Sequence, residues 1–259
     1  MTTKPYANLD LTGRVVIVTG GASGIGEAAA PLLASRGAAV VVADVNDQGG
    51  ERTVAGIRKA GGRASYIRTD VSKESDVEAM VRFAITEFGG LHGAFNNAGL
   101  TSKGAALIEM PLADWQQMIG VNLTGVFLCM KHEIAYMLGH GGGSVVNTSS
   151  GAGIVGFPHV LDYVAAKHGV VGLTRAAAVD YSAKGVRINV ILPGGVDTPM
   201  LRHAMGQDPV VRDTVGAGHP IGRLAEASEL AEAAAFLLSD AASFMTGSVV
   251  AVDGGYTCQ

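Results

Sequence analysis

The segment RVVIVTGGASGIG, residues 14–26, joins a β-branched apolar run to a glycine-rich turn. The run predicts a buried strand, and the turn places Gly20, Gly24 and Gly26 where a helix should begin. Glycines at such a junction permit a tight turn and let the backbone and the helix N-terminus approach a pyrophosphate. Because 37 of the 259 residues are glycine, their placement at the junction, more than their spacing, predicts a nucleotide site.

Six further short apolar runs follow along the chain, at residues 38–44, 63–70, 93–99, 143–150, 186–194 and 247–255. Helical patterns lie between them, for example at residues 28–36, 51–60, 75–88 and 112–138. Apolar strands that alternate with helices indicate a mostly parallel sheet covered by helices on both faces. The sequence therefore predicts an α/β protein, with one doubly wound Rossmann domain over residues 1–259 and a seven-stranded sheet. In such a fold ligands bind at the carboxyl ends of the strands.

The second predicted strand ends at Asp44, 18 residues after Gly26. A carboxylate at this position can accept hydrogen bonds from the ribose hydroxyls of a dinucleotide and would repel a 2′-phosphate. Residues 20–26 and 44–50 contain no Lys or Arg that could bind such a phosphate. The pattern favours NAD over NADP, and the alternative is that Asp44 only begins the turn DVND at 44–47.

Tyr163 and Lys167 stand four residues apart in the segment DYVAAKHG, residues 162–169. On a helix they would share one face, with their Cβ atoms about 5 to 6 Å apart. A nearby ammonium favours the phenolate and lowers the pKa of a tyrosine, so the pair could transfer protons. The alternative is structural: a tyrosine packed in the core and a lysine that extends to water.

Composition excludes several classes of protein. Hydrophobic residues make up 48%, charged residues 16% and aromatic residues only 5%, so the core must consist mainly of Ala, Val, Leu and Ile. The net charge of −4 is spread along the chain, which argues against a nucleic-acid partner. A long uncharged stretch, residues 138–161, is interrupted by glycines, and the N-terminal residues lack the apolar core of a signal peptide. We expect a cytoplasmic protein without a membrane segment.

The cysteines and histidines predict no metal site. Cys129 and Cys258 are isolated, and the seven histidines show no ligand spacing such as H-E-x-x-H. Two separate thiols without a partner motif are typical of a reducing compartment.

Seven motifs together carry a family resemblance: TGGASGIG at 19–26, DV at 70–71, NNAG at 96–99, VNLTG at 121–125, NTSS at 147–150, YVAAK at 163–167 and PGGVDTPM at 193–200. In this order they resemble the roughly 250-residue branch of the short-chain dehydrogenase/reductase family. The resemblance covers nearly the whole chain and favours the functional interpretation of Tyr163 and Lys167.

The resemblance implies a role for each matching position. Tyr163 would be the general acid/base, Lys167 would lower the pKa of Tyr163 and hold the nicotinamide ribose, Ser150 would bind the substrate oxygen, and Asn122 would anchor a water relay. The cofactor would be NAD, held by Gly20, Ser23, Gly24, Ile25, Gly26, Asp44, Val45, Asp70, Val71, Asn97, Ala98, Gly99, Tyr163, Lys167, Pro193, Gly194, Val196 and Thr198. Gly195 departs from the family, which often has a bulkier residue there, and we expect it to leave room beside the nicotinamide.

The expected reaction is hydride transfer between NAD(H) and a secondary alcohol or ketone. Stretches such as GVFLCMK at 125–131 are similar to dehydrogenases of cyclic alcohols and diols. The substrate walls should come from Leu100 and Thr101, from Ala152, Ile154, Phe157 and Val160, and from a lid at about residues 198–222 that includes Met200, Leu201 and Met205. Because nearly all are apolar, a hydrophobic or cyclic substrate is favoured. His159, Arg202 and His203 would suit a carboxylate or a polyol if they turned inward.

Other functions remain open at this point. A sugar, a polyol or a 3-oxoacyl thioester could be reduced at the same site, and a protein that only senses dinucleotides could share the fold.

The segments at 121–138 and 163–182 are apolar or small on most faces, so each must be covered on every side, and family members usually cover them with partner subunits. We therefore expect a homotetramer. A secondary expectation is that the terminal carboxylate of Gln259 binds a cation near a symmetry axis of that tetramer.

Overall fold

The computed structural model describes residues 9–204 and 209–258. Its seven strands form one sheet in the order β3-β2-β1-β4-β5-β6-β7, and every neighbouring pair is parallel. The predicted Rossmann-type fold is therefore confirmed, with a sheet that is wholly parallel within these residues. The strands are β1 (Val15–Thr19), β2 (Ala39–Asp44), β3 (Arg63–Arg68), β4 (Gly93–Asn96), β5 (Gly143–Thr148), β6 (Val186–Pro193) and β7 (Val249–Val252).

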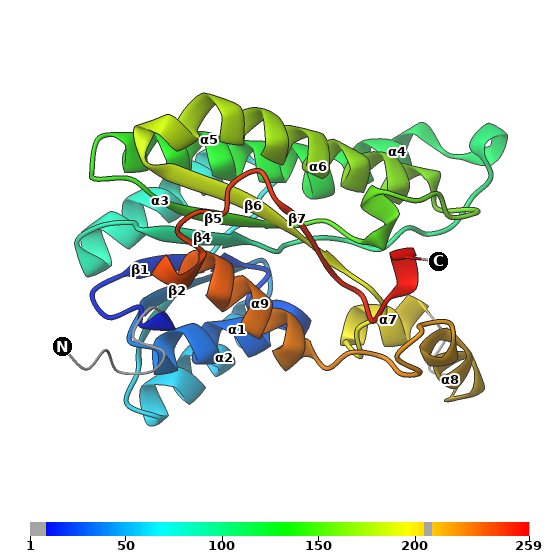
Figure 1. The fold of residues 1–259 in the computed structure, drawn as a ribbon, viewed down its shortest axis with the longest axis horizontal. Helices are drawn as coiled ribbons and strands as arrows, with labels where there is room; N and C mark the ends of the chain where they lie inside the picture. The colour runs from blue at the N-terminus through cyan, green and yellow to red at the C-terminus, as the bar shows by residue number, and fades with distance from the viewer. Residues whose placement is uncertain (1–8, 205–208, 259) are drawn as a thin grey trace.

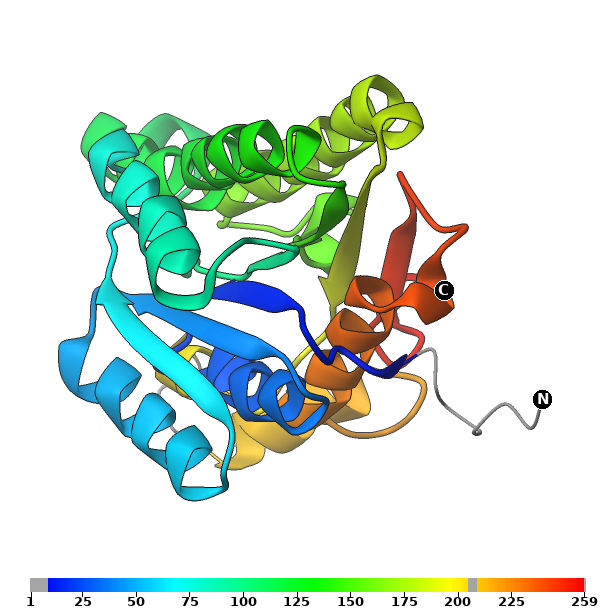
Figure 2. The same cartoon turned by 90° about the vertical axis from the view of Figure 1, so that its left-hand side faces the viewer.

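Helices cover both faces of the sheet (Figures 1 and 2). One face is covered by α3 (Glu74–Phe88), α4 (Leu112–Ile119), α5 (Gly125–Leu138) and α6 (Leu161–Tyr181). The other is covered by α1 (Gly24–Ser35), α2 (Asp47–Lys59) and α9 (Ala227–Leu238). A separate apolar cluster fills each interface, built mainly from Val, Ala, Leu and Ile as the composition indicates. Within residues 9–204 and 209–258, no helix combines the length and apolar character needed to cross a bilayer.

The helical pattern at 112–138 is interrupted in the structure. Between α4 and α5 the chain forms a π-helical turn, η3 (Gly120–Thr124), and Asn122 lies in it with its side chain fully buried. Hydrophobic periodicity predicts one continuous helix here because a single wide turn barely changes which residues face the sheet. Turns of this kind are frequent at functional sites.

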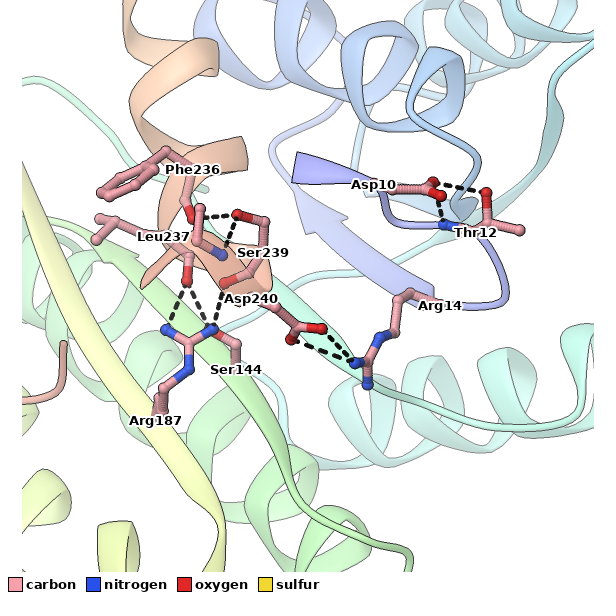
Figure 3. Close-up of polar contacts among 10 residues, drawn as sticks. Asp10, Thr12, Arg14, Ser144, Arg187, Phe236, Leu237, Ser239 and Asp240 are labelled. Carbon is pink, nitrogen blue, oxygen red and sulfur yellow. Dashed lines mark hydrogen bonds and ion pairs between the residues drawn. The ribbon is translucent and has the colours of Figure 1, made fainter. Parts of the chain in front are cut away.

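The carboxyl end of α9 is attached to the sheet by side chains from two strands (Figure 3). Arg187 of β6 donates to the carbonyls of Leu237 (2.8 Å) and Ser239 (2.9 Å), and the Ser144 hydroxyl of β5 also donates to Leu237 (3.0 Å). The last carbonyls of a helix have no partner within the helix, so these donors stabilise its end. The position of α9 is thereby fixed across β5 and β6.

A buried polar network joins the centre of the sheet to α5 and α6. The Asn96 amide donates to Glu133 (3.0 Å) and to Asn147 (3.1 Å), and Asn147 donates to the Thr174 hydroxyl (2.9 Å). Glu133 Oε1 and Asn96 Oδ1 have no partner among the described residues. Burial raises the pKa of the Glu133 carboxyl to about 7, although the hydrogen bond from Asn96 opposes the rise. The native protein therefore favours a neutral Glu133.

This network predicts a pH-dependent gain in stability from Glu133→Gln. The folded protein retains the Glu133 proton between pH 4.5 and about 7, where the unfolded chain releases it. The Glu133 carboxyl therefore makes its full contribution to folding stability below pH 4.5, and this contribution is lost as the pH rises through 7. Glutamine is neutral throughout, so we expect the variant to gain up to about 3 kcal/mol at alkaline pH. Urea unfolding at roughly pH 5 and pH 8 measures this, and an equal change at both values would contradict it.

Candidate active site

A cleft of about 800 Å³ opens at the carboxyl ends of β1, β2, β4, β5 and β6. All of the residues predicted to bind the cofactor line it except Gly26. Two further elements border it, α7 (Pro199–Ala204) and α8 (Pro209–Ala217), which lie beside the C-terminal turn η7 (Tyr256–Cys258) at the same end of the molecule (Figure 1). The fold therefore brings the expected motifs together at one edge of the sheet.

The glycine-rich turn after β1 is tightly packed against the turn after β4. Gly20 and Gly24 have positive φ values of 67° and 56°, a conformation that favours glycine. Gly26 does not line the cleft because it packs beneath it: a Cβ atom there would lie 2.2 Å from the Gly20 carbonyl oxygen. The Thr19 hydroxyl accepts hydrogen bonds from the amides of Asn97 (3.0 Å) and Ala98 (3.1 Å). This close approach leaves the N-terminus of α1 open to the cleft, as anion binding requires.

Asp44 lies at the end of β2 and lines the cleft. Its two carboxylate oxygens accept hydrogen bonds from the amides of Ala22 (3.0 Å) and Asn46 (2.9 Å). A carboxylate oxygen can accept more than one hydrogen bond, so these contacts hold the group in place without preventing ribose binding. Arg68 lies opposite Asp44 in the register of β3, which the linear sequence does not reveal. It donates instead to the Val45 carbonyl and to Asp47, and it does not line the cleft.

Asp70 and Val71 follow β3 and also line the cleft. Asp70 Oδ1 accepts hydrogen bonds from the Ser72 hydroxyl (2.6 Å) and the Ser72 amide (3.1 Å), and Lys73 lies 3.3 Å from its second oxygen. The hydrogen bonds from Ser72 and the charge of Lys73 hold the pKa of Asp70 below its ordinary value, although burial opposes them. Asp70 therefore forms part of the wall as a fixed anion.

Tyr163 and Lys167 lie one turn apart on α6, and both line the cleft. Lys167 Nζ is 5.5 Å from the centre of the Tyr163 ring, so the predicted common face is confirmed. Burial raises the pKa of the Tyr163 phenol, and a hydrogen bond with the Ser150 side chain opposes that rise. Burial thus sets the direction of this shift, and the lowering by Lys167 that the family resemblance implies stays a prediction.

Lys167 is buried and attached to the end of β5 by two hydrogen bonds. Its Nζ donates to the Thr148 carbonyl (2.9 Å), and its own carbonyl accepts from the Ser149 hydroxyl (2.8 Å). Burial lowers the pKa of the Lys167 amine to about 8, so most of it is protonated at neutral pH. The arrangement places a cation in the lining of the cleft, beside the Tyr163 ring.

Asn122 does not line the cleft but holds the backbone of Leu100, which does. Its side chain accepts from the Leu100 amide (2.7 Å) and donates to the Leu100 carbonyl (2.9 Å). Gly99 lies between Asn122 and Lys167: a Cβ atom there would be 3.4 Å from Asn122 Oδ1 and 3.8 Å from Lys167 Nζ. The π-helical turn thus fixes the loop after β4, while the water relay expected at Asn122 stays a prediction.

Most of the expected substrate walls face the cleft. Ser150, which follows β5, lines it and accepts a hydrogen bond from the Ala152 amide (3.2 Å). The prediction that Ile154 forms a substrate wall is wrong, because Ile154 is 44% exposed and does not line the cleft. The chain turns away after the short helix at Gly151–Gly153 and returns at Phe157. Met205 and Gln259 lie outside the described residues. The expected walls that do line the cleft are Leu100, Thr101, Ala152, Phe157, Val160, Met200 and Leu201.

The three polar residues that could have made this pocket hydrophilic do not line the cleft. His159 is exposed and has a φ of 60°, a left-handed conformation that histidine adopts more readily than most residues. Arg202 is exposed and pairs with Asp197 (2.7 Å), and His203 is also exposed. The observed wall is therefore predominantly apolar.

The room expected beside Gly195 is filled by His219. A Cβ atom at Gly195 would lie 2.7 Å from Leu224 Cδ2 and 2.9 Å from His219 Cε1. His219 is buried, its Nε2 accepts from the Gly195 amide (2.9 Å), and its Nδ1 lies 2.9 Å from the Val215 carbonyl. The glycine therefore tightens this wall, since it allows the imidazole to pack directly against the backbone.

His219 and Tyr256 line the cleft but lie outside the motifs that identify the site in the sequence. His219 is in the variable segment after β6, and Tyr256 is in the C-terminal turn. Both reach the cleft only through packing between segments distant in the chain. The sequence HPIG at 219–222 offered the one available indication, a histidine beside a proline in the expected lid.

A group of potential metal ligands lies away from the cleft. Single ligand atoms of Glu74, Glu78 and His132 lie within 4.8 Å of one another. Glu74 Oε1 is already paired with Lys131 (2.6 Å) and His132 (3.0 Å). We assign no metal to this surface group.

Known proteins resemble the chain over most of its length. Residues 20–257 match the family profile described as enoyl-(acyl carrier protein) reductase. The 2,5-dichloro-2,5-cyclohexadiene-1,4-diol dehydrogenase of Sphingobium indicum is 52% identical, over 96% of this chain and 98% of that protein. The cyclohexanol dehydrogenase of an Acinetobacter species is 44% identical, over 94% and 95%.

Solved structures also resemble the chain over nearly its whole length. The crystal structure of levodione reductase superposes with a TM-score of 0.93 at 41% identity, covering 96% of this chain and 99% of that one. A candidate 2-deoxy-D-gluconate 3-dehydrogenase from Agrobacterium tumefaciens with bound NADP gives 0.89 at 33% identity, covering 98% and 100%. The chain therefore belongs to the short-chain dehydrogenase/reductase family, whose enzymes use nicotinamide dinucleotide cofactors.

Proposed function

We propose that the protein is an NAD-dependent dehydrogenase or reductase that acts on hydrophobic, cyclic secondary alcohols and their ketones. The observation that carries the proposal is an apolar wall, including Phe157, Val160 and Leu201, in the same cleft as the Ser150, Tyr163 and Lys167 side chains. Relatives at 44% to 52% identity are named for cyclohexanol and a cyclohexadiene diol. A cyclic alcohol would bury apolar area there, with only its reacting oxygen needing the catalytic hydroxyls.

The residues of the cleft fit a nicotinamide dinucleotide. Gly20 and Gly24 give a backbone that an anion can approach, Asp44 offers a carboxylate for the ribose, and Lys167 uses one of its three donors on Thr148. When bound, the cofactor would supply hydride transfer. The protein must then position the substrate and manage one proton.

The catalytic residues divide this work. Tyr163 accepts the proton of the alcohol at its phenol oxygen, or donates it to the ketone in reverse. Ser150 donates a hydrogen bond to the substrate oxygen, where negative charge develops. Tyr163 must be a phenolate to accept that proton, and the Lys167 cation 5.5 Å from its ring would favour that form. The Nζ donors that Thr148 does not use would be available to the ribose. General acid/base help of this kind accelerates a reaction by about 10² to 10⁴.

A polar substrate is the main alternative, because the same residues could reduce a sugar, a polyol or a 3-oxoacyl thioester. Sugar hydroxyls buried against apolar walls would cost roughly 1 to 3 kcal/mol each when unpaired. We therefore expect kcat/KM with NAD to favour cyclohexanol clearly over glucose. A preference for glucose would overturn the substrate class, and absence of turnover with every alcohol tested would support a dinucleotide-sensing role.

The second part of the proposal is a preference for NAD over NADP, carried by Asp44. We expect Asp44→Asn to shrink this preference, because asparagine can still accept from the Ala22 amide but no longer repels a 2′-phosphate. The lost charge-assisted bonds to ribose should weaken NAD binding by roughly 1 to 3 kcal/mol. Titration of both dinucleotides against both proteins tests this. Wild-type affinity for NADP equal to that for NAD would refute the role of Asp44.

We also propose that the protein is a homotetramer. Phe127 on α5 and Val179 on α6 are 47% and 84% exposed, and Phe244 near β7 is fully exposed. Large exposed apolar side chains on two helices and a turn of one chain are typical of surfaces that partner subunits cover. Sedimentation at micromolar concentration should show a tetramer, and Phe127→Glu should shift it to smaller species. A monomeric wild-type protein would contradict the proposal.

A further inference from the structure

Three aromatic side chains from distant segments form one wall of the cleft. Phe157 lies in the loop after β5, His219 follows α8, and Tyr256 lies in the C-terminal turn. The Phe157 and Tyr256 rings are stacked, with centres 5.7 Å apart and planes 16° apart, and the His219 and Tyr256 centres are 5.0 Å apart. Tyr256 therefore lies between the other two and is held by both.

The backbone around Tyr256 is fixed by the preceding aspartate and glycines. Asp253 is buried and accepts hydrogen bonds from the Gly255 amide (3.0 Å), the Thr257 amide (2.9 Å) and the Thr257 hydroxyl (2.5 Å). The Ile221 amide donates to the Gly254 carbonyl (3.1 Å), which joins the C-terminal turn to the segment after α8. Gly254 and Gly255 both have positive φ values, so the turn depends on glycine. The position of the Tyr256 ring is thus set by long-range contacts.

Tyr256 lies close to the catalytic serine. Gly151 directly follows Ser150, and a Cβ atom on it would lie 3.9 Å from Tyr256 Cδ1 and 3.3 Å from Thr257 Cγ2. The Tyr256 hydroxyl has no hydrogen-bond partner within residues 9–204 and 209–258. A tyrosine combines an apolar ring with a polar tip, so its hydroxyl usually finds a partner when it is enclosed. Tyr256 therefore brings to the lining of the cleft a hydroxyl that no protein group in these residues uses.

We propose that Tyr256 determines substrate specificity by binding a second oxygen of the ring substrate. This inference rests on the proposed function. The reacting oxygen of a cyclic alcohol is bound by Ser150 and Tyr163, and a hydroxyl or carbonyl elsewhere on the ring reaches the Tyr256 phenol. Phe157 packs against the ring carbons beside it. The pocket then favours a cyclic diol or hydroxyketone over a simple cyclic alcohol of the same size.

The test compares Tyr256→Phe with the wild-type enzyme on cyclohexane-1,4-diol and cyclohexanol, with NAD. We expect the ratio of kcat/KM for the diol to that for cyclohexanol to fall about three- to tenfold, the worth of one neutral hydrogen bond. Tyr256→Leu should reduce kcat/KM for both alcohols, because it also removes the ring. Tyr136→Phe is the matched control: Tyr136 lies in α5, stacks on His140 just after that helix and does not line the cleft, so the loss of its hydroxyl should leave the ratio unchanged.

Two results would overturn the inference, and they differ from failure of the proposed function. An unchanged ratio in Tyr256→Phe would show that the hydroxyl does not recognise the second oxygen. An equal loss for both alcohols, with a lowered melting temperature, would show a structural role. If the wild-type enzyme turns over neither alcohol, the proposed function fails and the inference fails with it.

Discussion

Tyr163→Phe should lose turnover by about 10² to 10⁴ and bind NAD nearly as tightly as the wild-type protein. Only the phenol oxygen is removed, and that oxygen interacts with Ser150 in the cleft. The Lys167 ammonium keeps its hydrogen bond to Thr148, and the Asp44 carboxylate keeps its contacts. Steady-state kinetics with a cyclic alcohol and titration with NAD measure the two effects separately.

A companion variant tests the second hydroxyl that is expected to bind the substrate oxygen. Ser150→Ala should also lower turnover, because it removes the donor to the substrate oxygen, while leaving the Tyr163 phenol in place. If Tyr163→Phe kept more than roughly a tenth of wild-type activity, general acid/base catalysis would have to come from another group. Loss of NAD binding in the same variant would instead indicate that the phenol supports the cofactor site.

Local sequence patterns were sufficient to predict the sheet and the edge at which the cleft lies. The strand runs ending at Thr19, Asp44 and Asn96 can be recognised because a buried parallel strand is apolar throughout. Their carboxyl ends meet in space as a consequence of the topology. Asp44 follows because it stands at such an end, whereas the roles expected of Ser150 and Tyr163 came from the resemblance of their motifs to the family. These properties are local or set by the winding of the sheet.

The misjudged features depend on contacts between distant segments. Gly195 suggested free space, but His219 fills it from a segment 24 residues later in the chain. Burial by other elements raises the pKa of Tyr163, an influence that the position of Lys167 four residues away does not reveal. Tyr256 had no recognisable motif, since only the turn at Gly254 and Gly255 brings it to Phe157. Sequence spacing does not report which side chains fill a cavity.

Gly26→Ala is expected to lower both the stability of the protein and its affinity for NAD. A Cβ atom at Gly26 would lie 2.2 Å from the Gly20 carbonyl oxygen and 2.9 Å from the Asn97 side-chain nitrogen. The first contact is with backbone, so it can be relieved only if the turn after β1 moves away from α1. That movement would displace the amides that face the cleft and the turn held by Thr19. We expect a lower melting temperature and NAD affinity reduced by more than about tenfold, or a protein that does not fold.

Gly56→Ala is the matched control for this change. Gly56 lies within α2, is exposed, and a Cβ atom there would meet nothing within 4 Å. Alanine is the better helix former, so this variant should be more stable by about 0.5 to 1 kcal/mol and should bind NAD normally. The same substitution should therefore act in opposite directions at the two glycines. Wild-type stability and NAD affinity in Gly26→Ala would contradict the view that close packing of Gly26 on Gly20 shapes the dinucleotide site.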